Sequence, residues 1–210
     1  MKIKSYKGLT LIETIVAIAI FTIGIEGFTI LLSRSWTQNA YTIEMGQTSM
    51  AASQAVNRVV GYIREARQGD NGAYPVVSAD DNDLVIFSDY DRDGQTERLH
   101  FYRSASDLLM GIREPSSGFP ITYASGYGEI KTITSCVVND ADNPIFAYYD
   151  ADYPEDSVNN PVNTPALAPD IRLVRITIHI NINPDRAPDN IEIRSFAEMR
   201  NLNDHDRFGL

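Results

Sequence analysis

Three aspartates alternate with other residues in one short segment, where carboxylate oxygens could bind a metal ion. Asp89, Asp91 and Asp93 occupy every second position and are followed by Gly94. This spacing is typical of the opening of loops that bind Ca²⁺. The twelfth position from Asp89 is His100, where an EF-hand requires an acid, and the flanking segments are typical of strands. Two interpretations stay open: a calcium site with the three aspartates as ligands, or a polar hairpin turn in which Gly94 supplies a positive φ.

A fourth carboxylate lies where charge is costly. Glu13 falls within residues 9–32, which are almost wholly apolar apart from Glu13 and Glu26. An ionised carboxylate in hydrocarbon costs on the order of several kcal/mol unless it is paired or serves a purpose. We therefore expect Glu13 to pair with a cation; the alternative is a glutamate that snorkels or becomes protonated. The pattern indicates no role for Glu26.

Groupings typical of a catalytic centre are not recognisable in the chain. There is no Ser-His-Asp grouping, phosphate loop, HExxH motif or pair of carboxylates at catalytic spacing. His179 belongs to a strand-like alternation and is expected on its solvent side. Cys136 is the only cysteine, so no intramolecular disulfide can form. It is expected to be a buried small side chain; the alternative is an intermolecular or reactive thiol. We expect no enzyme activity and no cofactor other than Ca²⁺.

Charge is distributed unevenly along the 210 residues. The net charge is −10, yet Lys2, Lys4 and Lys7 place three positive charges in the first eight residues. Removal of residues 1–8 would therefore change the net charge from −10 to −13. An acidic surface repels phosphate backbones, so we expect no nucleic-acid binding across the bulk surface.

The segment that carries Glu13 is long enough to span a membrane. Residues 9–32 would form a helix of roughly 36 Å, which exceeds the hydrocarbon thickness of about 30 Å. The lysines before it predict a cytoplasmic N-terminus and an exported acidic body. An ordinary signal peptide is the alternative, since residues 17–19 form a small-x-small triplet, but the apolar run continues well beyond that triplet.

The helix is expected to continue through residues 33–69 as an amphipathic half. One apolar stripe is carried by Val56, Val59, Val60, Ile63 and Ala66. Gly69 then supplies a stop signal. Such a stripe needs a covering sheet.

Residues 73–210 read as an antiparallel, β-rich domain. We expect a hairpin of residues 84–88 and 97–103, a strand at 108–113, and a pair of strands at 174–182 and 191–199. Residues 139–169, rich in Asn, Asp, Pro and Tyr, are expected to form a long surface excursion. Its tyrosines could contact a partner or pack on the sheet. The predicted fold class is α+β, with a long N-terminal helix packed on an antiparallel sheet.

The residues from Lys7 to Glu13, Lys-Gly-Leu-Thr-Leu-Ile-Glu, resemble the processing signal of type IV prepilins and pseudopilins. The resemblance implies that prepilin peptidase cleaves between Gly8 and Leu9 and methylates the new amine of Leu9. Leucine stands where phenylalanine is commoner. Glu13 becomes the fifth mature residue, and its carboxylate could neutralise the amine of a neighbouring subunit and set the axial register.

The order of elements is similar to that of larger minor pilins and pseudopilins, such as the J-type subunit of type II secretion and the W-type pilus subunit. This similarity implies an inner-membrane protein that enters an extracytoplasmic filament, contacts other pilin subunits, and acts in filament initiation. The alternative is a pilus-borne adhesin or DNA-uptake subunit that binds through the Tyr-rich residues 139–169.

Overall fold

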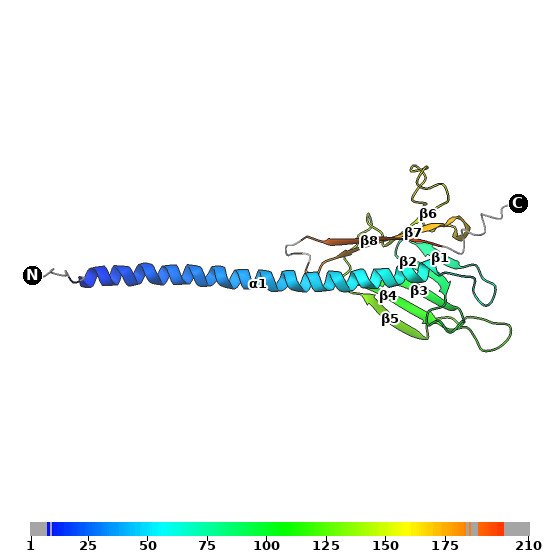
Figure 1. Ribbon diagram of the computed structural model, residues 1–210, viewed down its shortest axis with the longest axis horizontal. Helices are drawn as coiled ribbons and strands as arrows, with labels where there is room; N and C mark the ends of the chain where they lie inside the picture. The colour runs from blue at the N-terminus through cyan, green and yellow to red at the C-terminus, as the bar shows by residue number, and fades with distance from the viewer. Residues whose placement is uncertain (1–7, 9, 184, 186–188, 200–210) are drawn as a thin grey trace, which may run out of the picture. The chain divides into compact units, whose positions relative to one another are not determined.

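The computed structural model describes residues 8, 10–183, 185 and 189–199 of the chain. Its internal contacts divide the chain into two units, residues 1–44 and residues 45–210. The first unit is helical where it is described, and the second holds every described strand. The helix α1, from Leu11 to Arg64, runs through both units (Figure 1).

From residue 11 to residue 32, α1 is apolar on nearly all sides, and its charged residues there are Glu13 and Glu26. Every described residue from 10 to 40 is exposed, although most of these side chains are hydrophobic. The threonine hydroxyls are satisfied locally, since Thr22 donates to the carbonyl of Ile18 at 2.8 Å and Thr29 to that of Ile25 at 2.9 Å. By length and composition this helix can cross a membrane. The helix is thus suited to an apolar environment, as the sequence predicted.

The end of α1 differs from the predicted stop. Arg64 is its last residue, whereas the sequence indicated Gly69. After the last turn, the N–H of Arg67 donates to the carbonyl of Phe87 at 3.0 Å. A hydrogen bond to a neighbouring strand thus replaces the next helical bond, and a contact of this kind is invisible in local sequence signals.

Five antiparallel strands form the larger sheet of the second unit in the order β1-β2-β3-β4-β5. They are β1 (Val76–Asp80), β2 (Asp83–Ser88), β3 (Glu97–Ser104), β4 (Asp107–Arg113) and β5 (Glu129–Thr134). The predicted hairpin and the strand that follows it are confirmed as β2, β3 and β4. Each strand pairs with the next strand along the chain, so the connection between β2 and β3 is a loop that joins the ends of two neighbouring strands.

Three further antiparallel strands form a second sheet in the order β6-β7-β8. They are β6 (Phe146–Tyr149), β7 (Leu173–Ile180) and β8 (Ile191–Glu198), with a 3₁₀ turn, η1 (Ala168–Asp170), before β7. The predicted alternation is confirmed in β7, where Val174, Ile176, Ile178 and Ile180 are buried.

Part of the segment predicted as a surface excursion, residues 145–149, lies in the core, whereas most of residues 150–169 are exposed. All four residues of β6 are buried, and the Tyr148 hydroxyl donates to the carbonyl of Asp80 at 2.8 Å. Tyr149 is also buried, and its ring packs on Tyr153 with centroids 4.4 Å apart. The apolar run is too short to show a periodicity, so the flanking Asn, Asp and Pro residues masked it. The tyrosines therefore pack on the sheet, the more ordinary of the two expectations.

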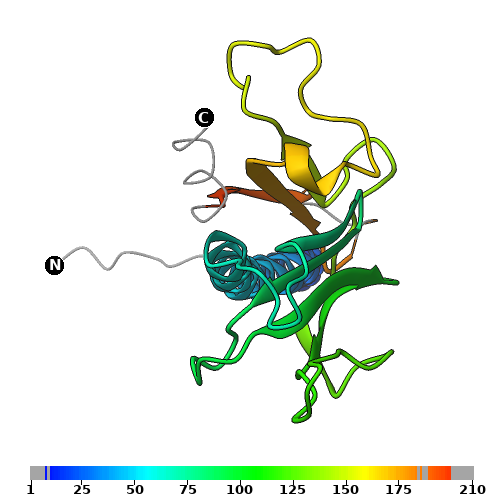
Figure 2. The ribbon, with the colours of Figure 1, turned by 90° about the vertical axis from the view of Figure 1, so that its right-hand side faces the viewer.

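The C-terminal part of α1 joins the two sheets in one core. In Figure 2 the three-stranded sheet lies on one side of this part of the helix and the five-stranded sheet on the other. The side chains of α1 that enter this core are Ala52, Val56, Val59, Val60 and Ile63. The guanidinium of Arg64 also donates to the carbonyl of Phe196 in β8 at 3.2 Å. The predicted α+β class, a long helix packed on antiparallel sheet, is confirmed.

Truncation of the helix stripe should destabilise the second unit. Ile63 is fully buried, whereas Met50 on the same helix is 70% exposed. We expect Ile63→Ala to lower the free energy of unfolding by about 3 kcal/mol and Met50→Ala to change it by less than about 0.5 kcal/mol. Urea denaturation of the full chain in detergent, followed by the near-ultraviolet circular dichroism of its tyrosines, measures both. Equal losses would contradict this account of the core.

Candidate functional site

The predicted processing bond lies directly before α1. Gly8 is exposed, Thr10 precedes the first helical residue, and Leu9 lies outside the described residues. A side-chain carbon at position 8 would meet no atom within 4 Å. Glycine is therefore not required at this position by packing within the chain.

Glu13 belongs to a capping box at the start of α1. One of its oxygens, Oε2, accepts from the backbone N–H of Thr10 at 2.8 Å and from the Thr10 hydroxyl at 2.8 Å. In return, the Glu13 N–H donates to the Thr10 hydroxyl oxygen at 3.4 Å. This reciprocal arrangement satisfies backbone donors that a helix start leaves unpaired. The sequence signal for this box is the Thr-x-x-Glu spacing of Thr10 and Glu13.

The capping box leaves part of the Glu13 carboxylate available. Among the described residues, the hydrogen bonds that its carboxylate accepts all use Oε2. The surrounding surface is apolar, since Ile12, Val16 and Ile20 lie beside Glu13 along a shallow groove. An anionic oxygen on an apolar helix is a ligand for a cation that approaches from outside the chain.

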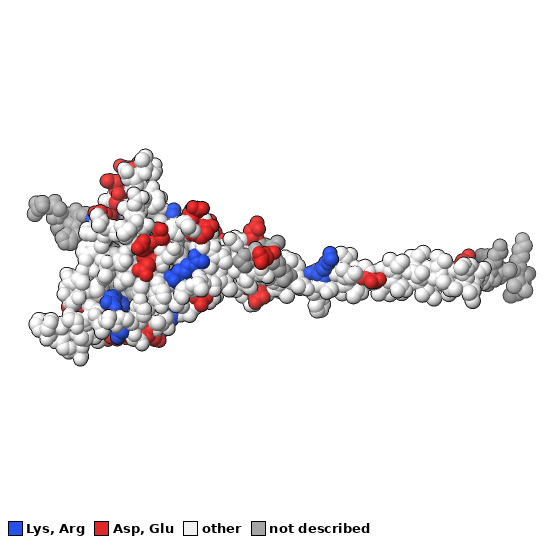
Figure 3. Space-filling view, turned by 180° about the vertical axis from the view of Figure 1, so that it is seen from behind, with Lys and Arg blue, Asp and Glu red and all other residues white. Residues whose placement is uncertain are grey.

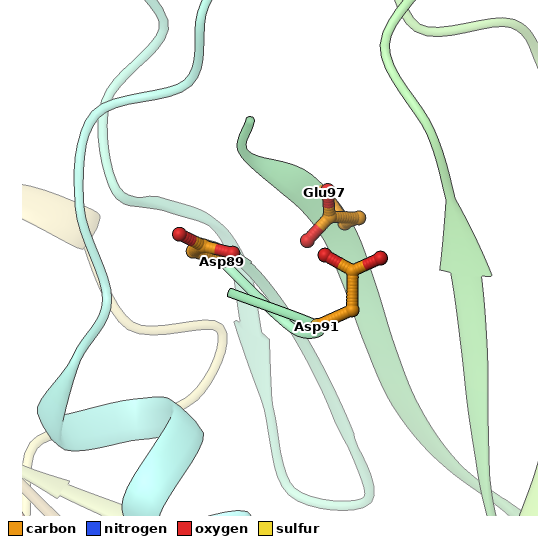
Figure 4. A group of neighbouring side chains, drawn as sticks. All are labelled: Asp89, Asp91 and Glu97. Carbon is orange, nitrogen blue, oxygen red and sulfur yellow. The ribbon is translucent and has the colours of Figure 1, made fainter. Parts of the chain in front are cut away.

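A second group of carboxylates lies in the connection between β2 and β3. Asp89, Asp91 and Glu97 each place an oxygen within 4.8 Å of the others (Figure 4). Asp93, which the sequence predicted as a ligand, turns elsewhere: its carboxylate accepts from the backbone N–H of Gln95 at 2.7 Å and from the Gln95 side-chain amide at 2.8 Å. The sequence did not predict Glu97 as a ligand, because the pattern of residues 97–103 assigned it to a strand. It is the first residue of β3 and is turned toward the loop.

The loop is fastened to the segment that follows α1. The guanidinium of Arg67 lies 3.3 Å from Asp89 Oδ2 and donates to the Thr96 hydroxyl at 2.8 Å and to the Gly94 carbonyl at 2.9 Å. Gly94 has a φ of 94°, as the hairpin interpretation predicted. The turn and the carboxylate cluster thus occur together.

Glu97 is an acid in an unfavourable position for its charge. Its side chain is fully buried, Oε2 accepts from the N–H of Tyr90 at 2.6 Å, and Oε1 has no hydrogen-bond partner among the described residues. Burial raises the pKa of Glu97 to about 7; the bond from Tyr90 opposes this, and the charges of Glu114 and Asp91 add to it.

The other residues singled out in the sequence take structural positions. His100 is held between Asp83 and Tyr127 by hydrogen bonds from both ring nitrogens. His179 was expected to face solvent, but its side chain is only 17% exposed and lies 3.8 Å from Glu192 on the paired strand. Cys136 is a free, partly buried thiol that follows β5 with a φ of 61°. Cross-strand pairing explains the burial of His179.

Acidic side chains gather on the second unit. Figure 3 shows this distribution, with long uncharged stretches along the first part of α1. Glu26 is exposed on that helix. The contrast agrees with an apolar segment and an acidic, water-exposed body.

Comparisons with known proteins identify one region of the chain. A family model described as the prokaryotic N-terminal methylation motif matches residues 3–25. No curated protein and no solved structure matches the chain. The match contains the predicted processing bond, the capping box and the first turns of α1.

The raised pKa of Glu97 predicts a pH dependence of stability. A carboxyl whose pKa is about 7 in the folded chain and 4.5 in the unfolded chain stabilises the fold fully below pH 4.5, and this stabilisation is lost as the pH rises through 7. The free energy of unfolding in a chelating buffer should therefore fall by about 3 kcal/mol across this interval. Glu97→Gln should remove most of that slope, and Glu155→Gln, an exposed acid in another loop, should retain it. Superimposable pH profiles of wild type and Glu97→Gln would refute the assignment.

Proposed function

We propose that this chain, a type IV prepilin-like protein by its N-terminal methylation motif, is a structural minor subunit of a type IV pilus-like or type II secretion pseudopilus filament. The observation that carries this proposal is the continuity of the motif at residues 3–25 with an apolar helix that can cross a membrane. A subunit needs both, because it waits in the bilayer before it assembles. Its work is filament initiation and assembly rather than catalysis.

Processing follows from the position of the motif. Prepilin peptidase would hydrolyse the bond between Gly8 and Leu9, remove the three lysines of the leader, and methylate the amine of Leu9. Before cleavage these lysines hold the N-terminus on the cytoplasmic side and leave the acidic second unit on the other side. The chain is consistent with a single-pass, membrane-anchored protein.

Glu13 would supply the contact between subunits. In the single chain its carboxylate is held by Thr10 through Oε2. In a filament, the methylated amine of a neighbouring Leu9 would approach the other oxygen. Where apolar helices exclude water, an unpaired charge is strongly unfavourable, so this pairing would select the correct stagger between neighbours.

The processing step can be tested by the intact mass of the chain recovered from membranes that contain an active prepilin peptidase. We expect a chain that begins at methylated Leu9. Gly8→Val should leave the leader attached, and since a side chain at position 8 meets no neighbouring atom, the loss would reflect recognition rather than misfolding. A chain that begins after Ala19 would overturn the proposal.

The assembly contact can be tested by substituting the two glutamates of the apolar helix separately. Glu13→Gln keeps an oxygen that can cap Thr10 but loses the charge, so we expect at least an approximately tenfold loss of incorporation into filaments. Glu26→Gln makes the same chemical change on the same helix and should incorporate normally. Immunoblots of sheared filaments and of membranes measure both. Equal incorporation of the two variants would contradict the pairing, and a variant missing from membranes would be discounted as unstable.

A further inference from the structure

The carboxylates between β2 and β3 leave two buried oxygens without partners. Asp89 Oδ1 and Glu97 Oε1 are both shielded from solvent and lack a hydrogen-bond partner among the described residues. A buried anionic oxygen that is left unpaired destabilises the folded chain. Both oxygens belong to side chains of the same three-carboxylate group. The cost would be offset if a cation lay between them.

Each carboxylate of the group is held from one side by a backbone N–H. Glu97 Oε2 accepts from Tyr90 at 2.6 Å, Asp89 Oδ2 from Gly94 at 3.2 Å, and Asp91 Oδ1 from Asp93 at 3.1 Å. In Glu97 and Asp89, the oxygen without a hydrogen-bond partner is the other oxygen of the same carboxylate, Oε1 and Oδ1 respectively. The backbone thus orients the group before any ligand binds, which lowers the entropy lost on binding.

The spacing of the oxygens fits a calcium ion. Oxygens from all three residues lie within 4.8 Å of one another, and two ligands at a typical Ca–O distance of about 2.4 Å are at most about 4.8 Å apart. Magnesium binds at about 2.1 Å, demands near-ideal octahedral geometry and usually keeps several water ligands, so three protein carboxylates suit it less well. The group holds no imidazole or thiolate, which transition metals prefer.

The local charge also suits a divalent ion. The three carboxylates are offset by one guanidinium, that of Arg67, at 3.3 Å from Asp89. A divalent cation would neutralise the remainder. A surface hollow of about 310 Å³ lies beside the group and is bordered by Asp89 and Tyr90.

We propose that Asp89, Asp91 and Glu97 bind one Ca²⁺ ion, and that the bound ion fastens the β2–β3 loop to the start of β3. Asp93, the third aspartate of the alternating motif, is outside the ligand set, because both of its oxygens are used by Gln95. Through Arg67, the same loop is bound to the segment after α1. The ion would therefore stabilise the junction between helix and sheet. This inference does not depend on assembly into a filament.

The test uses the purified full chain in detergent, CaCl₂ and isothermal titration calorimetry. We expect a single site with a Kd of about 10⁻⁴–10⁻³ M, the range of extracellular calcium modules, and a higher thermal midpoint at millimolar Ca²⁺. Asp91→Asn and Glu97→Gln should weaken binding at least about tenfold. Asp93→Asn removes the same charge from the same loop and should change the Kd by less than about threefold.

Two results would overturn the proposal. One is the absence of both binding heat and thermal shift with 10 mM CaCl₂ (about ten times the weakest expected Kd). The other is an equal loss in Asp91→Asn and Asp93→Asn, which would indicate general attraction to an acidic loop. Because Asp91 is exposed, its variant should fold even if Glu97→Gln does not. Tighter binding of MgCl₂ than of CaCl₂ would also overturn the assignment of the ion.

Discussion

Burial of the apolar stripe of α1 is the interaction on which the second unit depends. Val56, Val59 and Ile63 lie in one core with residues of both sheets. Residues from both sheets, such as Leu84 in β2 and Ile176 in β7, belong to the same core as this stripe. The helix thus acts as the shared hydrophobic partner of two sheets that are otherwise joined by few strand-to-strand contacts.

The first part of the same helix differs in its exposure, because no described side chain from residue 10 to 40 is buried. A helix that is apolar on all sides is suited to lipid or to the interior of an assembly. One continuous element can therefore link an apolar environment to a water-exposed domain. Its polar groups are satisfied within the helix: threonine hydroxyls bond to preceding carbonyls, and Glu13 caps the first turn. In the proposed filament, the charge of Glu13 would be matched by a cation from another chain.

Arg67 connects the helix to the acidic loop. It follows α1 directly, its N–H bonds to β2, and its guanidinium holds Asp89 and the Thr96 hydroxyl. A change in the loop, such as the binding of an ion, would therefore act on the segment where the helix meets the sheet. These contacts form one continuous path of few residues, so stabilisation of the loop would also stabilise the segment that follows the helix.

The sequence by itself determined the features that depend on local pattern: the apolar length of residues 9–32, the stripe to Ile63, the alternation in β7, and the methylation motif. Each is a periodicity or a short motif, which neighbouring residues along the chain suffice to reveal. Only the tertiary structure decided that β6 is buried and that the helix ends at Arg64, where the N–H of Arg67 bonds to β2 instead. It also decided that Glu97 joins Asp89 and Asp91 while Asp93 does not. These outcomes depend on which residues meet across the sheet, and strand register, not spacing along the chain, sets those meetings.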